Sequence, residues 1–132
     1  MSTIKTTTLS TQGGSTVPVD TVVNGTAKAW VNFNGTGTVA IRRAFNVSSV
    51  SDLGTGDFIV NFTTAMPDAN YCINVNARGN GDFNRGGGGL VYVPNATLPT
   101  TSAVRFSTGL GSTAASDGLI FDQDYIFVTI FS

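Results

Sequence analysis

The sequence predicts an all-β protein: an antiparallel β-sandwich of jelly-roll-like type, with about nine strands and an extended N-terminal arm. Apolar and polar residues alternate with a period of two along many short segments, and turns rich in Gly, Asn and Asp join these segments. No stretch of useful length has a helical period. A chain of 132 residues is expected to form one domain around one core. We therefore expect an attachment arm over 1–16 and a single β-sandwich domain over 17–132.

The first 16 residues are rich in threonine and serine and poor in apolar side chains. Beyond Met1, the sizeable apolar residues in this segment are Ile4 and Leu9. A segment with so little apolar surface of its own stays ordered only when a partner holds it. We expect this arm to lie against a neighbouring subunit or a larger assembly, with Ile4 and Leu9 among the contacts.

Two segments follow the arm. Residues 17–23, VPVDTVV, are expected to form an edge strand, because Pro18 cannot donate a hydrogen bond to a central ladder. The stretch AKAWVNFNGTGTVAIR, residues 27–42, alternates on both sides of Asn34-Gly35, which is a favoured hairpin dipeptide. It therefore predicts a β-hairpin. Trp30 is expected to pack over the second sheet or at a subunit contact.

Alternation predicts three more strands in the middle of the chain. FNVSSV, residues 45–50, would place Phe45, Val47 and Ser49 on one side. The other two strands are DFIVNFT (57–63), with Phe58, Val60 and Phe62 inward, and NYCINVNA (70–77), with Tyr71, Ile73, Val75 and Ala77 on one face.

The last strand, DYIFVTIF, is apolar on both faces, with Tyr125, Phe127 and Phe131 on one side. Such a strand should be central and covered on both sides, by the second sheet and by another subunit. The opposite face supplies three more predicted assembly contacts, which are Ile126, Val128 and Ile130. Shorter strands are expected in LVYV, SAVRFST and GLIFD.

Composition argues against several functions. Only 11% of the residues are charged, the net charge is −1, and Arg42-Arg43 is the only adjacent pair of cations, which argues against nucleic-acid binding. The N-terminus lacks a secretory signal and no long apolar run occurs, so we expect synthesis in a cytoplasm and no membrane insertion. Cys72 is the single cysteine, which excludes an internal disulfide.

The sequence does not indicate an enzyme. It contains no His and no Glu, and most of its aspartates lie in or beside turn sequences that favour Asp locally. Asp122 and Asp124 could share a cation, but no dense acidic loop accompanies them, and a turn explains the pair better. We therefore expect no catalytic residue, no metal and no cofactor.

One long loop is the preferred place for a contact with a partner or a receptor. RGNGDFNRGGGG, residues 78–89, is long for a compact β domain. Phe83 cannot join the strand core by alternation, and flat aromatic rings stack on sugar rings. The predicted contacts, on a cell-surface glycan or a partner subunit, are Arg78, Asp82, Phe83 and Arg85.

The phrases AKAWVNFNGTGTVAIR and FNVSSVSDLGTGDFIVNFTTAMPDANYCINVNA resemble a module of bacteriophage virion proteins. Many of these are tail-fibre or other structural proteins of phages of aquatic bacteria. The resemblance covers about residues 22–77 and is looser beyond. It implies a non-enzymatic β domain on the exterior of the virion, commonly trimeric.

These observations lead to one main hypothesis and two alternatives. The main hypothesis is a homotrimeric virion surface appendage, a capsid decoration or head fibre, whose arm grips other virion proteins of the capsid or tail. The first alternative is a tail-fibre or receptor-binding knob that recognises the host surface. However, 132 residues filled by one sandwich leave no room for a fibre shaft. The second alternative is a free carbohydrate-binding module of the infected cell.

Overall fold

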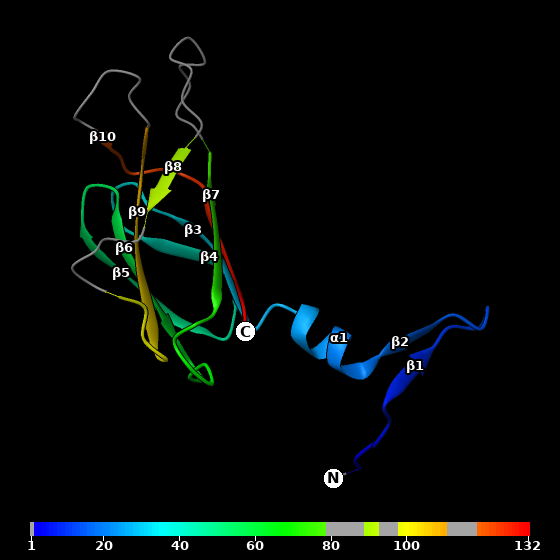
Figure 1. Ribbon diagram of the computed structural model, residues 1–132. Helices are drawn as coiled ribbons and strands as arrows, with labels where there is room; N and C mark the ends of the chain where they lie inside the picture. The colour runs from blue at the N-terminus through cyan, green and yellow to red at the C-terminus, as the bar shows by residue number, and fades with distance from the viewer. Residues whose placement is uncertain (1, 79–88, 93–97, 111–118) are drawn as a thin grey trace.

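The computed structural model describes residues 2–78, 89–92, 98–110 and 119–132. Two antiparallel sheets face each other (Figure 1), and the side chains between them form one apolar core. The nine strands β3 to β11 build this sandwich, and the predicted all-β fold class is confirmed. A small hairpin and a short helix precede it.

The first sheet has four strands in the order β4-β3-β11-β7. The C-terminal strand β11 is central, as its sequence predicts, because it pairs with β3 on one side and with β7 on the other. The bounds of these strands are β3 (Ala29–Asn34), β4 (Ala40–Phe45), β7 (Cys72–Ala77) and β11 (Ile126–Phe131).

The second sheet has five strands, in which β6 lies between β5 and β9. Gly109 and Leu110 of β9 each pair with both β8 and β10, so these two short strands lie on opposite sides of β9. Since β8 and β6 pair with opposite sides of β9, β10 lies on the same side of β9 as β6, beyond the end of β6. The bounds are β5 (Val47–Gly54), β6 (Asp57–Phe62), β8 (Gly89–Tyr92), β9 (Ala103–Leu110) and β10 (Leu119–Ile120).

Three phenylalanines form the centre of the core. Phe33 from the first sheet contacts Phe58 and Phe106 from the second, with ring centroids 5.3 and 6.4 Å apart and edge-to-face geometry. Such pairs add to the free energy gained by burying the rings. The other buried apolar residues are Ala29, Val31, Val60, Phe62, Met66, Tyr71, Val104, Ile126, Val128 and Ile130.

The predicted hairpin of residues 27–42 is confirmed as β3 and β4, but its turn is longer than two residues. Asn34 pairs with Ala40, so five residues connect the strands. The Asn34 side chain donates to the Thr36 carbonyl at 2.7 Å and fixes the start of this loop. At Gly35 a Cβ atom would lie 2.7 Å from Phe58, so the glycine is needed for packing.

The chain passes from one sheet to the other at Asn46, which has a left-handed φ of 53°. Its side chain donates to the Lys28 and Thr64 carbonyls at 3.0 and 3.1 Å. This conformation breaks the alternation expected over 45–50, since Phe45 points outward while Val47 packs against the core. A register shift between Val47 and Ser49 then brings Val50, not Ser49, to the core side. The predicted common face of Phe45, Val47 and Ser49 is therefore wrong.

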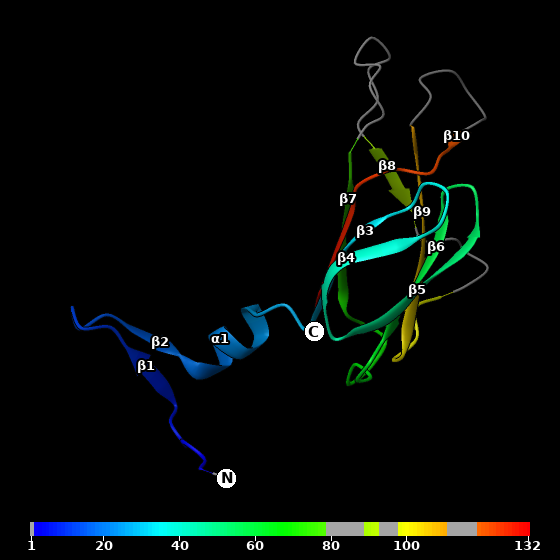
Figure 2. The same ribbon diagram turned by 180° about the vertical axis from the view of Figure 1, so that it is seen from behind.

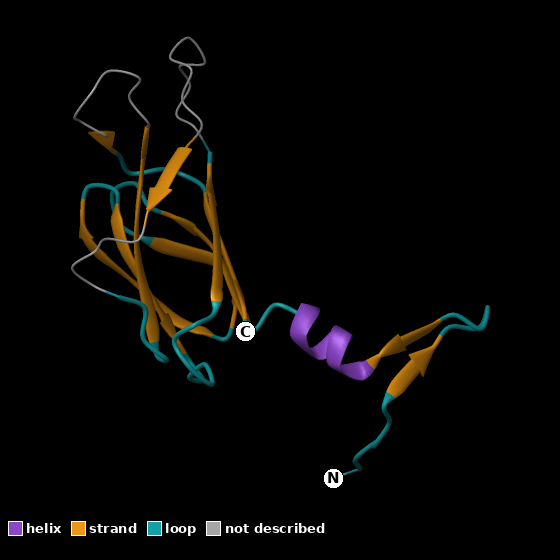
Figure 3. Cartoon of the chain, in the orientation of Figure 1, coloured by secondary structure: helices purple, strands orange, loops and turns teal. Residues whose placement is uncertain are grey.

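The strand predicted over 17–23 is also wrong. Its first residues end the short strand β2, and a helix begins at Val19, as Figure 3 shows. Pro18, with φ near −59°, has the backbone angle that suits the start of a helix, and Asp20 in the first turn favours its N-terminal end. The bounds are β1 (Thr8–Ser10), β2 (Thr16–Pro18) and α1 (Val19–Gly25).

Residues 2–25, which we call the N-terminal segment, stand outside the sandwich in both views (Figures 1 and 2). None of these residues is buried, and the first buried residue of the chain is Ala29. The part outside the sandwich therefore extends nine residues beyond the expected end of the arm at residue 16, since it includes β2 and α1.

Candidate functional site

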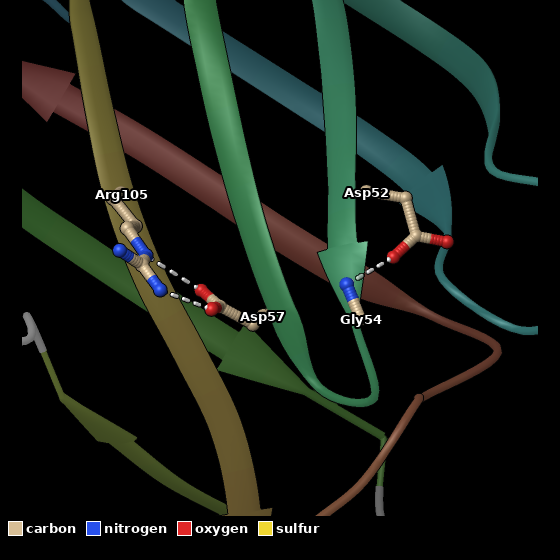
Figure 4. A network of polar contacts seen from close by, with 4 residues as sticks. All are labelled: Asp52, Gly54, Asp57 and Arg105. Atoms are coloured by element: carbon tan, nitrogen blue, oxygen red, sulfur yellow. Dashed lines mark hydrogen bonds and ion pairs between the residues drawn. The ribbon is translucent and has the colours of Figure 1, made fainter.

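The outer faces of the two sheets differ in chemistry. On the five-stranded sheet the outward groups are mostly polar: the Asn61 amide donates to the hydroxyls of Ser49 and Ser51 at 3.1 and 3.2 Å. Beside them Asp57 binds Arg105, and Asp52 accepts from the Gly54 backbone at 2.9 Å (Figure 4). These groups satisfy one another within the chain, which leaves this face ordinary protein surface.

The outer face of the four-stranded sheet is aromatic. Strand register places Phe45 beside Trp30, and Phe127 beside Asn32, on neighbouring strands. The Phe45 and Phe127 side chains are 55% and 41% exposed. We call this surface the aromatic-arginine face, made of Trp30, Phe45, Tyr125, Phe127 and Phe131 with Arg42, Arg43 and Arg78.

Tyr125 is the centre of the charged part of this face. Its ring stacks on Phe127 with centroids 6.2 Å apart, and the Arg42 guanidinium lies over it at 3.9 Å. Arg78 approaches the same ring at 5.5 Å and also pairs with the Asp124 carboxylate at 3.3 Å. Cation-π contact and ion pairing thus hold two guanidinium groups beside one aromatic pair.

The N-terminal segment is the second candidate surface, because its apolar side chains have no core to enter. Leu9 and Val17 pair across the hairpin and therefore lie on the same side of it. A two-stranded hairpin and a seven-residue helix are each marginal without further packing. The exposed large apolar residues of the segment are Ile4, Leu9, Val17, Val22 and Val23.

The structure separates the predicted assembly contacts into two groups. Ile4 and Leu9 are exposed, and Trp30 is half-buried on the outer face, so all three are accessible to a partner. The prediction for the other three is wrong, because the inner side of β11 points into the core of the sandwich. These residues are Ile126, Val128 and Ile130, which are 0–1% exposed.

Of the predicted contact loop, residues 78–89, the structure describes the first residue, Arg78, and the last, Gly89, which begins β8. Arg78 is exposed and belongs to the aromatic-arginine face. The other predicted contacts, Asp82, Phe83 and Arg85, lie outside the described residues.

Sequence reasoning assigned no role to Arg42 or Arg43, and it expected Tyr125 and Phe127 only on a covered face of the last strand. The signals were present, since Arg42 and Arg43 form the one adjacent pair of cations and alternation sets Tyr125 and Phe127 on the outer side of the last strand. What the sequence lacked was the pairing of β4, β3 and β11, which brings these residues to one face.

The acidic residues considered for a cation have separate partners. The Asp122 carboxylate accepts a hydrogen bond from the Gly56 backbone at 2.7 Å, whereas Asp124 faces Arg78. Among the described residues, no group of three or more His, Cys, Asp or Glu side chains is placed to hold a metal ion.

One tyrosine, Tyr71, has a raised pKa. Tyr71 is 7% exposed, and its hydroxyl lies 2.9 and 3.1 Å from the carbonyl oxygens of Thr100 and Ala103. Burial raises the pKa of Tyr71 from 10.0 to about 12. This hydroxyl ties the start of β7 to that of β9, which is a structural role.

Comparison with known proteins gives no assignment: the chain matches no protein-family model, no curated protein and no solved structure. In the part of the chain that the structure describes, no helix has both the length and the hydropathy that crossing a bilayer requires.

Proposed function

We propose that this protein is a structural protein of a bacteriophage particle, a homotrimeric surface appendage that its N-terminal segment anchors to the capsid as a decoration or head fibre. The proposal combines the resemblance of residues 22–77 to virion modules with the shape of the chain. A compact sandwich on a projecting segment is the form expected of an appendage. The chain acts by assembly and carries out no catalysis.

The observation that carries this proposal is the exposure of apolar side chains on the N-terminal segment. Ile4, Leu9 and Val23 are 90%, 48% and 51% exposed, and the segment has no buried residue. Side chains of this kind gain free energy when a partner covers them, about 25 cal/mol for each Å² of apolar surface. The segment thus has the properties of a part that folds fully against other proteins.

Two kinds of contact would hold the segment in place. Its strands have unpaired backbone groups on their outer edges, which can add to a sheet edge of a virion protein. Its apolar residues would pack against the partner and against the same segment of symmetric copies, which gives the trimer.

Deletion of residues 2–25 tests the proposal. The truncated chain should keep the β-sheet circular dichroism spectrum and cooperative thermal unfolding of the parent, because every core residue lies beyond Gly25. It should be lost from purified virions and, by light scattering, should be a monomer. A milder variant, Ile4→Ser with Leu9→Ser, should reduce incorporation, while Leu98→Ser on the sandwich, at a residue 74% exposed, should not. Normal incorporation of the truncated chain would refute the anchoring role.

A receptor-binding knob is the second candidate, and the open aromatic-arginine face favours it. Virions that lack the protein distinguish the two roles. Loss of a decoration should leave adsorption intact but allow genome release under heat or osmotic stress. Loss of a receptor-binding protein should abolish adsorption with normal stability. If mass spectrometry detects the protein in infected cells but not in gradient-purified particles, both roles are excluded in favour of a free carbohydrate-binding module.

A further inference from the structure

Positive charge is concentrated on the aromatic-arginine face although the whole chain has a net charge of −1. Arg42, Arg43 and Arg78 all lie there, and the one carboxylate paired with them, among the residues that the structure describes, is Asp124. This leaves a local surplus of cations in a chain that has few charges of either sign. The complementary partner is an anion.

Two of the guanidinium groups are already held in position. Arg42 lies on the Tyr125 ring at 3.9 Å, and Arg78 is held between that ring and Asp124. A guanidinium binds a carboxylate through two parallel hydrogen bonds, and a group that is already ordered loses less entropy when it does so. The charged groups are therefore suited to carboxylates.

The rest of the face carries two other kinds of side chain that bind sugars, aromatic rings and amides. The rings of Phe45, Phe127 and Trp30 offer flat apolar surfaces, and amides stand beside them at Asn74 and Asn76. We propose that the aromatic-arginine face binds a polysaccharide that carries carboxylate groups, with rings stacked on the sugars, amides bonded to hydroxyls and arginines paired with the carboxylates.

The size of the face fits an extended chain. Four strands span roughly 15 Å, and the six residue steps from Tyr125 to Phe131 span about 20 Å. A polysaccharide lying across the sheet can therefore contact Arg43 on β4, Phe127 on β11 and Asn76 on β7, which strand register places in one row.

Two other occupants fit less well. Single-stranded nucleic acid also stacks on aromatic rings, but its binding depends on broad positive charge. In this net-negative chain, the described residues place three cations on the face. A second copy related by a two-fold axis would place this positively charged face against the same positively charged face. A carboxylated polysaccharide complements both the positive charge and the aromatic rings of the face.

This inference does not depend on the proposed anchoring, because the face belongs to the sandwich and the anchor to the N-terminal segment. Binding is tested with the full chain and polygalacturonate by isothermal titration calorimetry, with the fluorescence of Trp30, the single tryptophan, as a second signal. We expect saturable binding that weakens as salt rises. The fully methyl-esterified polymer, which keeps the rings but loses the charges, should bind at least tenfold more weakly.

Two variants on the face and two matched controls locate the site. Arg43→Gln and Phe127→Thr should each weaken binding about fivefold or more. Lys5→Gln removes a charge outside the sandwich, and Leu53→Thr removes an exposed apolar side chain from β5, so both should stay within twofold of the parent. Thermal unfolding checks each variant, and Arg43→Gln tests the face independently if Phe127→Thr does not fold.

Any of five results would overturn the inference. These are no binding of polygalacturonate, equal binding of the esterified polymer, and face variants that bind as well as the parent. The fourth is tighter binding of oligo(dT), which would assign the face to nucleic acid. Equally, an oligomer that Phe127→Thr dissociates would assign the face to a second copy of the chain and refute the proposal.

Discussion

Arg105 on β9 and Asp57 on β6 form a two-point ion pair, with Nε to Oδ1 at 2.9 Å and Nη2 to Oδ2 at 2.5 Å. Their side chains are 27% and 16% exposed, so solvent screens the pair only in part. The register pairs Asp57 with Ser107 and Arg105 with Ile59, which makes this a diagonal contact across the two strands. It connects β6 and β9 in the centre of the five-stranded sheet.

Substitution of one partner of this ion pair should destabilise the fold. We expect Asp57→Asn to lower the free energy of unfolding by about 2 kcal/mol, because the guanidinium loses a charge-assisted bond in a partly buried place. The exposed pair of Arg78 and Asp124 is the matched control, and Asp124→Asn should cost less than about 0.5 kcal/mol. Urea denaturation measures both. Equal effects of the two substitutions would show that burial does not set the strength of the pair.

Gly56 should be far less tolerant of substitution than Gly37. Both have a left-handed φ, +65° and +62°, so alanine costs about 1 kcal/mol at either position. At Gly56 a Cβ atom would also lie 2.6 Å from the Thr108 carbonyl oxygen and 2.7 Å from the Phe121 nitrogen, whereas Gly37 has open space. We expect Gly56→Ala to cost about 3 kcal/mol in all. Thermal unfolding of the two variants side by side tests this, and similar melting temperatures would contradict it.

Stability should fall in strong base because of Tyr71. Its pKa is raised from 10.0 to about 12, so the folded state holds the proton more tightly than the unfolded state. The stabilisation is complete below pH 10 and is lost as the pH rises from 10 to 12, by about 2 kcal/mol. Tyr71→Phe should be less stable by about 1 kcal/mol at pH 8, since the Thr100 and Ala103 carbonyls lose their donor.

The advantage of the parent over Tyr71→Phe should fall to zero above pH 10 and reverse sign before pH 12, because the loss of about 2 kcal/mol exceeds the initial advantage of about 1 kcal/mol and every other ionisable group is common to both chains. Urea midpoints at pH 8, 10 and 11.5 measure it. A parallel loss of stability in the two chains would mean that Tyr71 does not titrate as its burial implies.

Alternation was a sound guide wherever a strand has one face in the core. It correctly predicted that Phe58, Val60 and Phe62 are buried and that the last strand is central. It failed over 45–50, because the left-handed Asn46 redirects the chain into the other sheet and an irregularity between Val47 and Ser49 shifts the period of β5. Asparagine adopts a left-handed φ more readily than most residues, so Asn46 was a weak local signal. The Lys28 and Thr64 carbonyls that bind its side chain are brought there by the fold.

The N-terminal helix could not be predicted from its composition. Valine and threonine dominate residues 19–25 and favour strands, and the one acidic residue of the first turn, Asp20, is a weak signal. The aromatic-arginine face also could not be predicted from the sequence, because it depends on strand pairing. Arg43 and Phe127 are 84 positions apart in the sequence, and only the joint pairing of β3 with β4 and β11 brings both beside Asn32.

The two ends of the sandwich are not equivalent. Lys28 donates its backbone N–H to the Ile130 carbonyl at 2.7 Å, so the last strand finishes where the N-terminal segment leaves, as Figures 1 and 2 show. A fluorescent protein or purification tag fused after Ser132 would therefore lie at the end of the sandwich where the N-terminal segment begins, and would crowd that segment. For labelling experiments the better insertion points are surface turns remote from that junction, such as Gly37, where the backbone has room around it.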